Sequence, residues 1–196
     1  MKYQDYAKFA KLSYEKASER KLDDLGLNDW NIDNLLSNDR RLVLVNPDNK
    51  QVVFAMRGTD ITNKKDLLTD VGIGVGVEKK MGQYKRANRT IRHIKNKYPD
   101  YNLSLTGHSM SALYAYNLGK KYDLESYSFN PPSSIPTNIT TTVGNWLVNA
   151  ISKPSKQKLY YVATDPIGFL GTTGLRGDVN YVKRKVKNPH SLENFL

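Results

Sequence analysis

The stretch Leu105-Thr106-Gly107-His108-Ser109-Met110-Ser111-Ala112 decides the fold. The alternating Leu-Ser-Leu-Thr over residues 103–106 predicts a strand, and a helical pattern follows at once from Ser109 to about Lys121. A serine on a sharp turn between a strand and a helix, with Gly107 two positions before it, is typical of a nucleophile elbow. We therefore predict an α/β fold in which Ser109 is a nucleophile.

The same stretch departs from the usual elbow after the serine. The position two residues further on, which is commonly glycine, is Ser111, and Ala112 follows it. Both side chains are small enough for the strand and the helix to pack closely. The motif is weaker than a full match, and its place between a strand and a helix gives it weight.

A serine hydroxyl needs a base in contact with it, and the sequence offers three histidines. His93 lies in a basic stretch of predicted helix, so we interpret it as a surface residue. His108 adjoins the nucleophile, where neighbouring side chains diverge, and we expect a packed or hydrogen-bonded structural role for it. His190 remains, in a loop after the last predicted strand. Without the elbow, we would interpret His190 as a surface histidine near the C-terminus. Because the elbow requires a base, we predict that His190 is that base.

The base in turn needs a carboxylate that fixes its tautomer, in the chain order serine, acid, histidine. Asp165 follows a predicted strand over residues 159–163 and is our candidate. Asp178 is the alternative, although it lies in a glycine-rich loop where aspartate often serves only the turn. The backbone N–H of Met110, at the positive end of the helix dipole, is the predicted oxyanion donor.

The rest of the chain predicts helices and strands in alternation. We expect a loop where Gly72, Gly74 and Gly76 alternate with apolar residues, because their spacing is not that of a dinucleotide site. The other predicted elements are helices over about 3–16 and 80–98, a hairpin of 41–45 and 51–56, and strands over 126–129 and 181–186. Together they predict one domain over residues 1–196, with a mostly parallel central sheet, an antiparallel N-terminal hairpin and helices on both faces.

The composition excludes several kinds of chemistry. There is no cysteine, which rules out disulfides, thiolate catalysis and thiolate zinc sites. Three histidines argue against a histidine-rich metal cage, so we expect no metal and no cofactor. No apolar run approaches the roughly 18 to 20 residues of a membrane span. Residues 1–5 lack the apolar core of a signal peptide, so secretion is unsupported by the sequence. A cytoplasmic or virion-associated location fits best.

The formal net charge of +11 has two readings. It either serves solubility or attracts an anionic partner such as nucleic acid, phospholipid headgroups or an acidic substrate. Charge alone does not choose between them.

The sequence resembles the class 3 lipases, the fungal triacylglycerol-lipase-like branch of the α/β hydrolases. The similar segments, in family order, are the N-terminal helix (residues 10–14), a strand ending in Arg-Gly-Thr (residues 54–60), the Gly-His-Ser elbow (residues 107–110), and the acid and histidine segments (residues 165–167 and 190–195). They span nearly the whole chain. The resemblance implies a compact α/β-hydrolase fold and the hydrolysis of lipid esters.

Two further features are implied by the resemblance alone. The backbone N–H of Thr59, and its hydroxyl, would be the second oxyanion donor, and residues from about 60 to 70 would cover the site as a lid. An ordinary surface helix is the alternative for that segment. The chain is shorter than the secreted members of the family and lacks their disulfides, so ester hydrolysis is better supported than activity on emulsified fat.

We thus expect a serine carboxylic ester hydrolase, a lipase or phospholipase A1-like enzyme, that forms an acyl-enzyme. Its partners would be a lipid or other ester substrate and an anionic membrane that contacts the basic surface, with nucleic acid ranked below them. The alternative is a hydrolase-like scaffold that has become a basic binding or structural protein for nucleic acid, an anionic membrane or an acidic partner.

Overall fold

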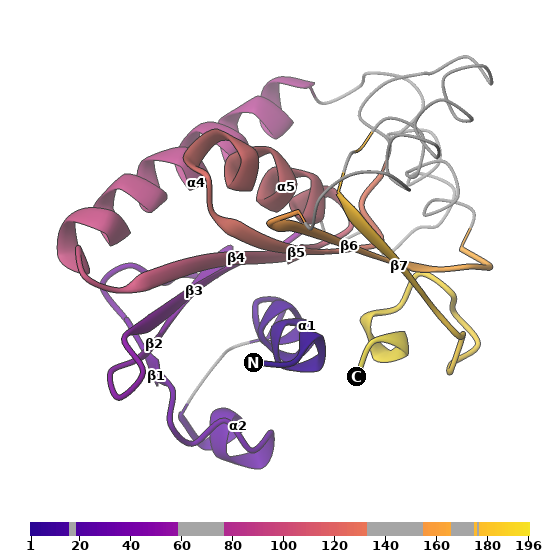
Figure 1. Ribbon diagram of the computed structural model, residues 1–196, viewed down its shortest axis with the longest axis horizontal. Coiled ribbons are helices and arrows are strands. Elements are labelled where there is room, and N and C mark those ends of the chain that lie inside the picture. Colours follow the sequence, from indigo (N-terminus) through magenta and orange to yellow (C-terminus); the bar gives the residue numbers. More distant parts are fainter. Residues whose placement is uncertain (16–18, 59–76, 133–154, 166–174, 176) are drawn as a thin grey trace.

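A seven-stranded sheet forms the centre of the computed structural model, which describes residues 1–15, 19–58, 77–132, 155–165, 175 and 177–196 (Figure 1). The strands lie in sequence order and are β1 (Asn31–Ile32), β2 (Arg41–Asn46), β3 (Gln51–Met56), β4 (Asn102–His108), β5 (Glu125–Phe129), β6 (Gln157–Val162) and β7 (Asp178–Val182). The pairs β1–β2 and β2–β3 are antiparallel, and every pair from β3 to β7 is parallel. The predicted sheet is confirmed.

Helices cover both faces of this sheet, as predicted (Figure 1). Helix α1 (Tyr3–Leu12) lies on one face, and α4 (Val77–Lys97) and α5 (Met110–Tyr122) lie on the other. Two short helices, α2 (Glu19–Asp24) and the 3₁₀ helix η1 (Leu192–Asn194), complete the described elements. No helix in the described ranges is long and apolar enough to cross a membrane.

Each face of the sheet has its own apolar core. The strands β2 and β3 are buried on both faces, which explains why their sequences are nearly continuous apolar runs. The α1 face contains Phe9, Leu12, Leu44, Val53, Phe129 and Phe195. The α4–α5 face contains Val43, Phe54, Ile91, Ile94, Leu105 and Leu118. The sheet is thus held rigidly from both sides, which fixes the ends of its strands.

The last strand lies earlier in the chain than predicted. The sequence pattern favoured residues 181–186, but β7 covers Asp178–Val182, because its first residue pairs with Lys158 and its last with the end of β6. The chain then leaves the sheet, and the backbone N–H groups of Lys185 and Val186 bind the side-chain oxygen of Asn194 instead of another strand.

Smaller differences concern the ends of helices and the short elements. Helix α1 ends at Leu12, not near residue 16, and the short elements β1, α2 and η1 were not predicted. Thr59, the possible lid over residues 60–70 and the glycines at 72, 74 and 76 lie outside the described residues.

Candidate active site

Ser109 occupies the sharp turn between β4 and α5, as the elbow motif predicts. Its backbone has φ 58° and ψ −129°, a region that non-glycine residues rarely adopt and that is found at functional sites. Its backbone N–H donates to the backbone oxygen of Phe129, at the end of β5, over 2.9 Å. Ser109 is only 7% exposed. The turn therefore holds the serine at the carboxyl ends of two neighbouring parallel strands.

Gly107 is required by the close approach of β4 and α5. A Cβ atom at this position would lie 2.6 Å from the backbone oxygen of Ser111 and 2.8 Å from its hydroxyl. Real Cβ atoms essentially never make such short contacts. The glycine before the serine thus has the steric role that the motif assigns to it.

Ser111, which departs from the usual glycine of the motif, is integrated into the turn by its hydroxyl. The hydroxyl accepts from the backbone N–H of His108 (3.1 Å) and has two carbonyl acceptors within reach, those of Met56 (2.7 Å) and His108 (2.9 Å). It therefore connects the ends of β3 and β4 to the first turn of α5. Sequence reasoning treated Ser111 only as a small residue and missed this role.

His190 and Asp165 form a close pair. Nδ1 of His190 lies 2.6 Å from Oδ2 of Asp165, whose carboxyl group is buried just beyond the end of β6. A carboxylate accepts a hydrogen bond, so this contact places the ring proton on Nδ1 and leaves Nε2 as the basic nitrogen. Nε2 is buried and has no hydrogen-bond partner among the described residues. It is therefore not hydrogen-bonded to the hydroxyl of Ser109 in this structure.

His108 is a buried, hydrogen-bonded residue, as expected. Its Nε2 donates to the backbone oxygen of His190 over 2.7 Å, and its ring centroid is 4.8 Å from that of His190. Burial, together with the neighbouring charge of His190, lowers the pKa of His108 to about 3, so its ring is neutral near pH 7. His108 therefore holds the backbone of His190 beside the elbow without competing for the proton.

The loop that carries His190 is fixed by Asn194, which sequence reasoning missed. The side-chain amide of this fully buried residue donates to the backbone oxygens of Asn188, Pro189 and Ser191. An asparagine four residues after a candidate base gave no recognisable signal, because its role depends on the path of the loop.

The predicted nucleophile, base and acid therefore lie at one end of the sheet. His108, next to Ser109, contacts His190, and His190 contacts Asp165. Asp178, the alternative acid, lies at the start of β7, hence at the opposite end of the parallel strands, where it binds Lys158 over 2.7 Å. The structure brings Asp165 to the histidine and does not bring Asp178 there. His93 is exposed on α4, as predicted.

Of the two predicted oxyanion donors, Met110 is described in the structure and Thr59 is not. Met110 is the first residue of α5, where backbone N–H groups have no partner within the helix. Thr59 is not described, but Gly58 before it donates its N–H to the hydroxyl of Tyr14 over 3.1 Å. The same hydroxyl lies 3.3 Å from the backbone oxygen of His108. Tyr14 thus ties the segment that leads to Thr59 against the elbow.

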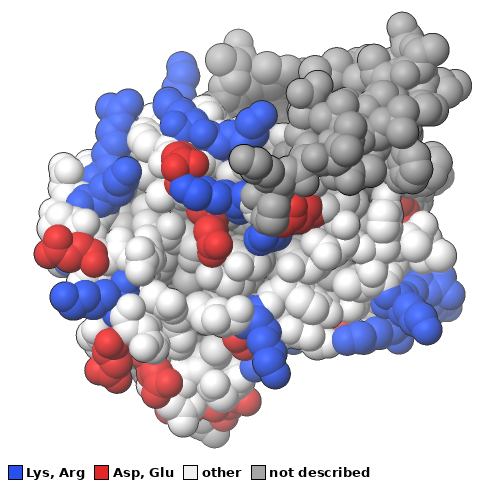
Figure 2. All heavy atoms as spheres, in the orientation of Figure 1, with Lys and Arg blue, Asp and Glu red and all other residues white. Residues whose placement is uncertain are grey.

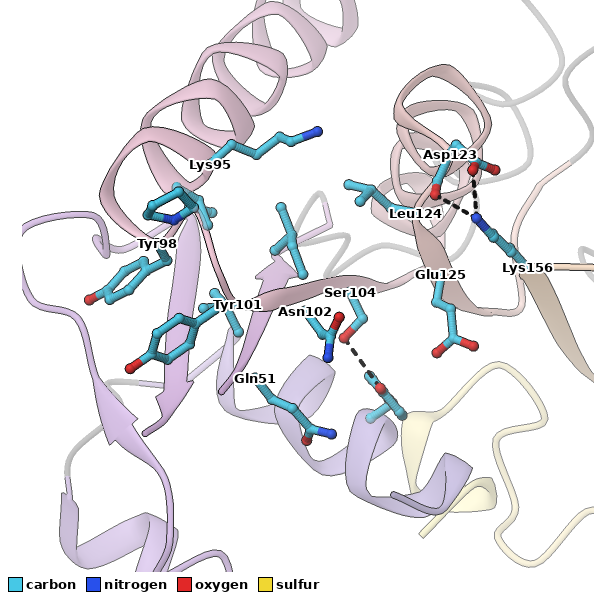
Figure 3. Close-up of a pocket in the computed structure, with 15 residues that line it drawn as sticks. Gln51, Lys95, Tyr98, Tyr101, Asn102, Ser104, Asp123, Leu124, Glu125 and Lys156 are labelled. Carbon is cyan, nitrogen blue, oxygen red and sulfur yellow. Dashed lines mark hydrogen bonds and ion pairs between the residues drawn. The ribbon is translucent and has the colours of Figure 1, made fainter. Parts of the chain in front are cut away.

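A cavity of about 550 Å³ lies away from Ser109, His190 and Asp165 (Figure 3). Its walls include Gln51, Asn102 and Glu125, which begin β3, β4 and β5. It therefore opens at the amino ends of the strands, opposite Ser109. No group of acidic or histidine side chains suited to a metal ion is found in the described ranges.

Comparison with known proteins gives likeness at the level of structure. No family model and no curated protein matches the sequence. A lipase from Yarrowia lipolytica superposes with a TM-score of 0.62 and 15% identity, over 98% of this chain and 81% of that chain. A lipase from Rhizopus microsporus var. chinensis superposes with a TM-score of 0.59 and 16% identity, over 94% of this chain and 74% of that chain. Lipase II from Rhizopus niveus superposes with a TM-score of 0.59 and 15% identity, over 95% of this chain and 82% of that chain. The chain thus has the compact α/β-hydrolase fold of the fungal class 3 lipases that its sequence resembles.

Proposed function

We propose that the protein is a serine carboxylic ester hydrolase that acts on lipid esters. The observation that carries this proposal is the 2.6 Å contact between His190 and Asp165. It leaves a buried Nε2 with no partner among the described residues, on a histidine that contacts His108 next to the strained turn of Ser109. A serine, a histidine with a free basic nitrogen and a buried orienting carboxylate are the components of acyl transfer. The lipase fold of the chain supports lipid esters as the substrate class.

In the proposed reaction, the hydroxyl oxygen of Ser109 attacks the ester carbonyl while Nε2 of His190 takes its proton. Asp165 keeps the imidazole in the required tautomer and stabilises the imidazolium. The backbone N–H groups of Met110 and Thr59 would hold the oxyanion. His190 then passes the proton to the leaving alcohol, and water, activated by the same ring, hydrolyses the acyl-enzyme.

A phospholipase A1-like activity is the substrate variant that we favour. Helix α4 exposes a row of cations, namely Lys85, Arg86, Arg89, Arg92 and Lys95. Figure 2 shows Lys and Arg side chains gathered over this part of the surface, at the upper left. Such a surface attracts the anionic headgroups of a phospholipid bilayer.

A fluorophosphonate probe, which reacts preferentially with an activated serine, tests the proposed nucleophile. We expect labelling of the wild type at Ser109 and none of Ser109→Ala. We expect His190→Ala and Asp165→Asn to lower kcat on p-nitrophenyl butyrate by about 10³-fold or more. Ser126→Ala is the matched control, because its buried hydroxyl has no partner in the described part of the chain.

The net charge of +11 also favours a second candidate, a basic binding protein on a hydrolase scaffold. A folded wild-type protein that takes no label, with and without detergent micelles, would contradict the esterase proposal. Binding to DNA or RNA that weakens steeply with salt would then support the second candidate.

A further inference from the structure

Four arginines surround a small cavity beside the candidate active site. The cavity has a volume of about 90 Å³ and is lined by Arg40, Arg41, Arg57 and Arg86, with Phe54 and Met56 of β3 at its apolar wall. No aspartate or glutamate among the described residues lines it. Its volume is well below the roughly 300 Å³ of a typical small-molecule site, so it suits one compact anionic group, not an acyl chain.

Three of the four arginines carry a positive charge that no described carboxylate neutralises. Arg40, Arg41 and Arg86 form no ion pair with any carboxylate that the structure describes. Burial, and then the nearby charge of Arg86, lowers the pKa of Arg41, which shows that the two guanidinium groups face like charge. An anion bound between them would relieve this repulsion.

Two of the guanidinium groups are held in place by backbone carbonyls. Nε of Arg41 donates to the oxygen of Leu36 over 2.9 Å, and one terminal nitrogen of Arg57 donates to the oxygen of Asp39 over 3.1 Å. A guanidinium has five N–H donors, so the bond from Arg41 to Leu36 leaves several donors of Arg41 for a ligand. Fixed, forked donors of this kind match the oxygens of a phosphate group.

Tyr114 adds an independent observation. It lines the same cavity from the second turn of α5, it is 7% exposed, and its hydroxyl has no hydrogen-bond partner among the described residues. Burial raises its pKa to about 12, so the hydroxyl stays protonated as a donor. Buried hydroxyls are normally paired, and an anion in the cavity would be the acceptor that this one lacks.

The cavity lies at the same end of the sheet as Ser109. Arg57 directly follows β3 and precedes Gly58, which packs against the elbow: a Cβ atom on Gly58 would lie 2.8 Å from the backbone oxygen of His108. Tyr114 belongs to the helix that begins next to Ser109. A group bound in the cavity would therefore be a near neighbour of an ester at the serine.

We propose that this arginine cavity binds the phosphate group of an anionic phospholipid and so selects the substrate of the hydrolase. The inference rests on the proposed function for its catalytic consequence, but the binding of the phosphate group does not. The exposed cations of α4 would draw the protein to the bilayer, and the cavity would then hold one headgroup.

Vesicle binding separates this site from general attraction of charge. The protein would carry Ser109→Ala, and it would be sedimented with vesicles of phosphatidylglycerol and phosphatidylcholine or of phosphatidylcholine alone. The cavity pair Arg40→Gln and Arg86→Gln removes two exposed charges, and the control pair Arg89→Gln and Arg92→Gln removes two exposed charges from α4 outside the cavity. We expect the cavity pair to weaken binding to the anionic vesicles at least about tenfold, and the control pair less than about threefold.

Equal losses for the two pairs would overturn the proposal, because they would show attraction by net charge only. Tyr114→Phe is a second variant, since it removes a hydroxyl that has no hydrogen-bond partner among the described residues, and it should weaken binding by a few fold. Inorganic phosphate and glycerol 3-phosphate form the soluble arm. If they bind the wild type as tightly as the vesicles do, the site takes free phosphate and the lipid assignment is wrong.

Turnover distinguishes failure of the site from failure of the enzyme proposal. We expect the ratio of kcat/KM for phosphatidylglycerol to that for phosphatidylcholine to fall about tenfold in the cavity pair and to persist in the control pair. A wild type that hydrolyses p-nitrophenyl butyrate but shows no preference between the two lipids would contradict the cavity proposal alone. A wild type that hydrolyses no ester would contradict the proposed function.

Discussion

Ser111→Ala tests the hydrogen bonds that hold the elbow together. The variant loses one accepted bond, from the N–H of His108, and one donated bond, to the carbonyl of Met56 or of His108. At a net value of about 1 kcal/mol for each bond, the loss is about 2 kcal/mol. The higher helix propensity of alanine offsets at most about 0.5 kcal/mol of this loss. We expect the free energy of unfolding to fall by about 1.5 kcal/mol.

Ser126→Ala is the matched comparison for this change. Both serines are fully buried, but the hydroxyl of Ser126 has no partner among the described residues, so its removal breaks no hydrogen bond. We expect this variant to be as stable as the wild type or slightly more stable.

Thermal unfolding followed by circular dichroism at pH 7, with urea titration as a second measurement, compares the two variants. For a chain of this length, 1.5 kcal/mol lowers Tm by about 3–6 °C. Equal Tm values for Ser111→Ala and Ser126→Ala would refute the reasoning, because burial without hydrogen bonding would then account for both sites.

Three further outcomes follow from the structure. Gly107→Ala should lower the free energy of unfolding by about 1–3 kcal/mol, because its Cβ would lie 2.6 Å from the backbone oxygen of Ser111; the urea midpoint measures this. Gly82→Ala, where the nearest atom is the flexible end of Arg86 at 3.5 Å, should instead raise stability by up to about 1 kcal/mol, and a loss at Gly82 as large as that at Gly107 would contradict the steric argument. The pKa of His108, about 3 in the folded protein against about 6.5 unfolded, means that the unfolded chain binds the additional proton between these values. Stability should therefore fall as pH decreases from 6.5 towards 3, by up to about 1.4 kcal/mol per pH unit, and urea titrations of His108→Gln over this range should show a shallower slope. An unchanged slope in that variant would exclude His108 as its source.

Local patterns predicted much of the fold because the relevant forces act between near neighbours in the sequence. The apolar runs of β2 and β3 and the turn between them specify a hairpin. The helical spacing of buried residues such as Ile91 and Ile94 specifies α4. The end of β7 was misplaced because its sequence continues as a plausible strand, while Asn194 supplies the hydrogen bonds that take Lys185 out of the sheet.

The functions of several side chains were not predictable from local patterns. The hydroxyl of Tyr14 meets Gly58 and His108, which are distant in the sequence, and no spacing rule connects them. Arg41 of β2 and Arg86 in the middle of α4 likewise line one cavity only in the folded chain.

By itself, the sequence determined the order of the elements, the sharp turn at Ser109 and a short set of candidate bases and acids. These follow from residue size, apolar periodicity and the chemistry available to each side chain. Only the tertiary structure decided that Asp165, and not Asp178, lies against His190. The reason is geometric: both residues adjoin parallel strands, but one follows its strand and the other begins it, so the sheet places their carboxylates at opposite ends.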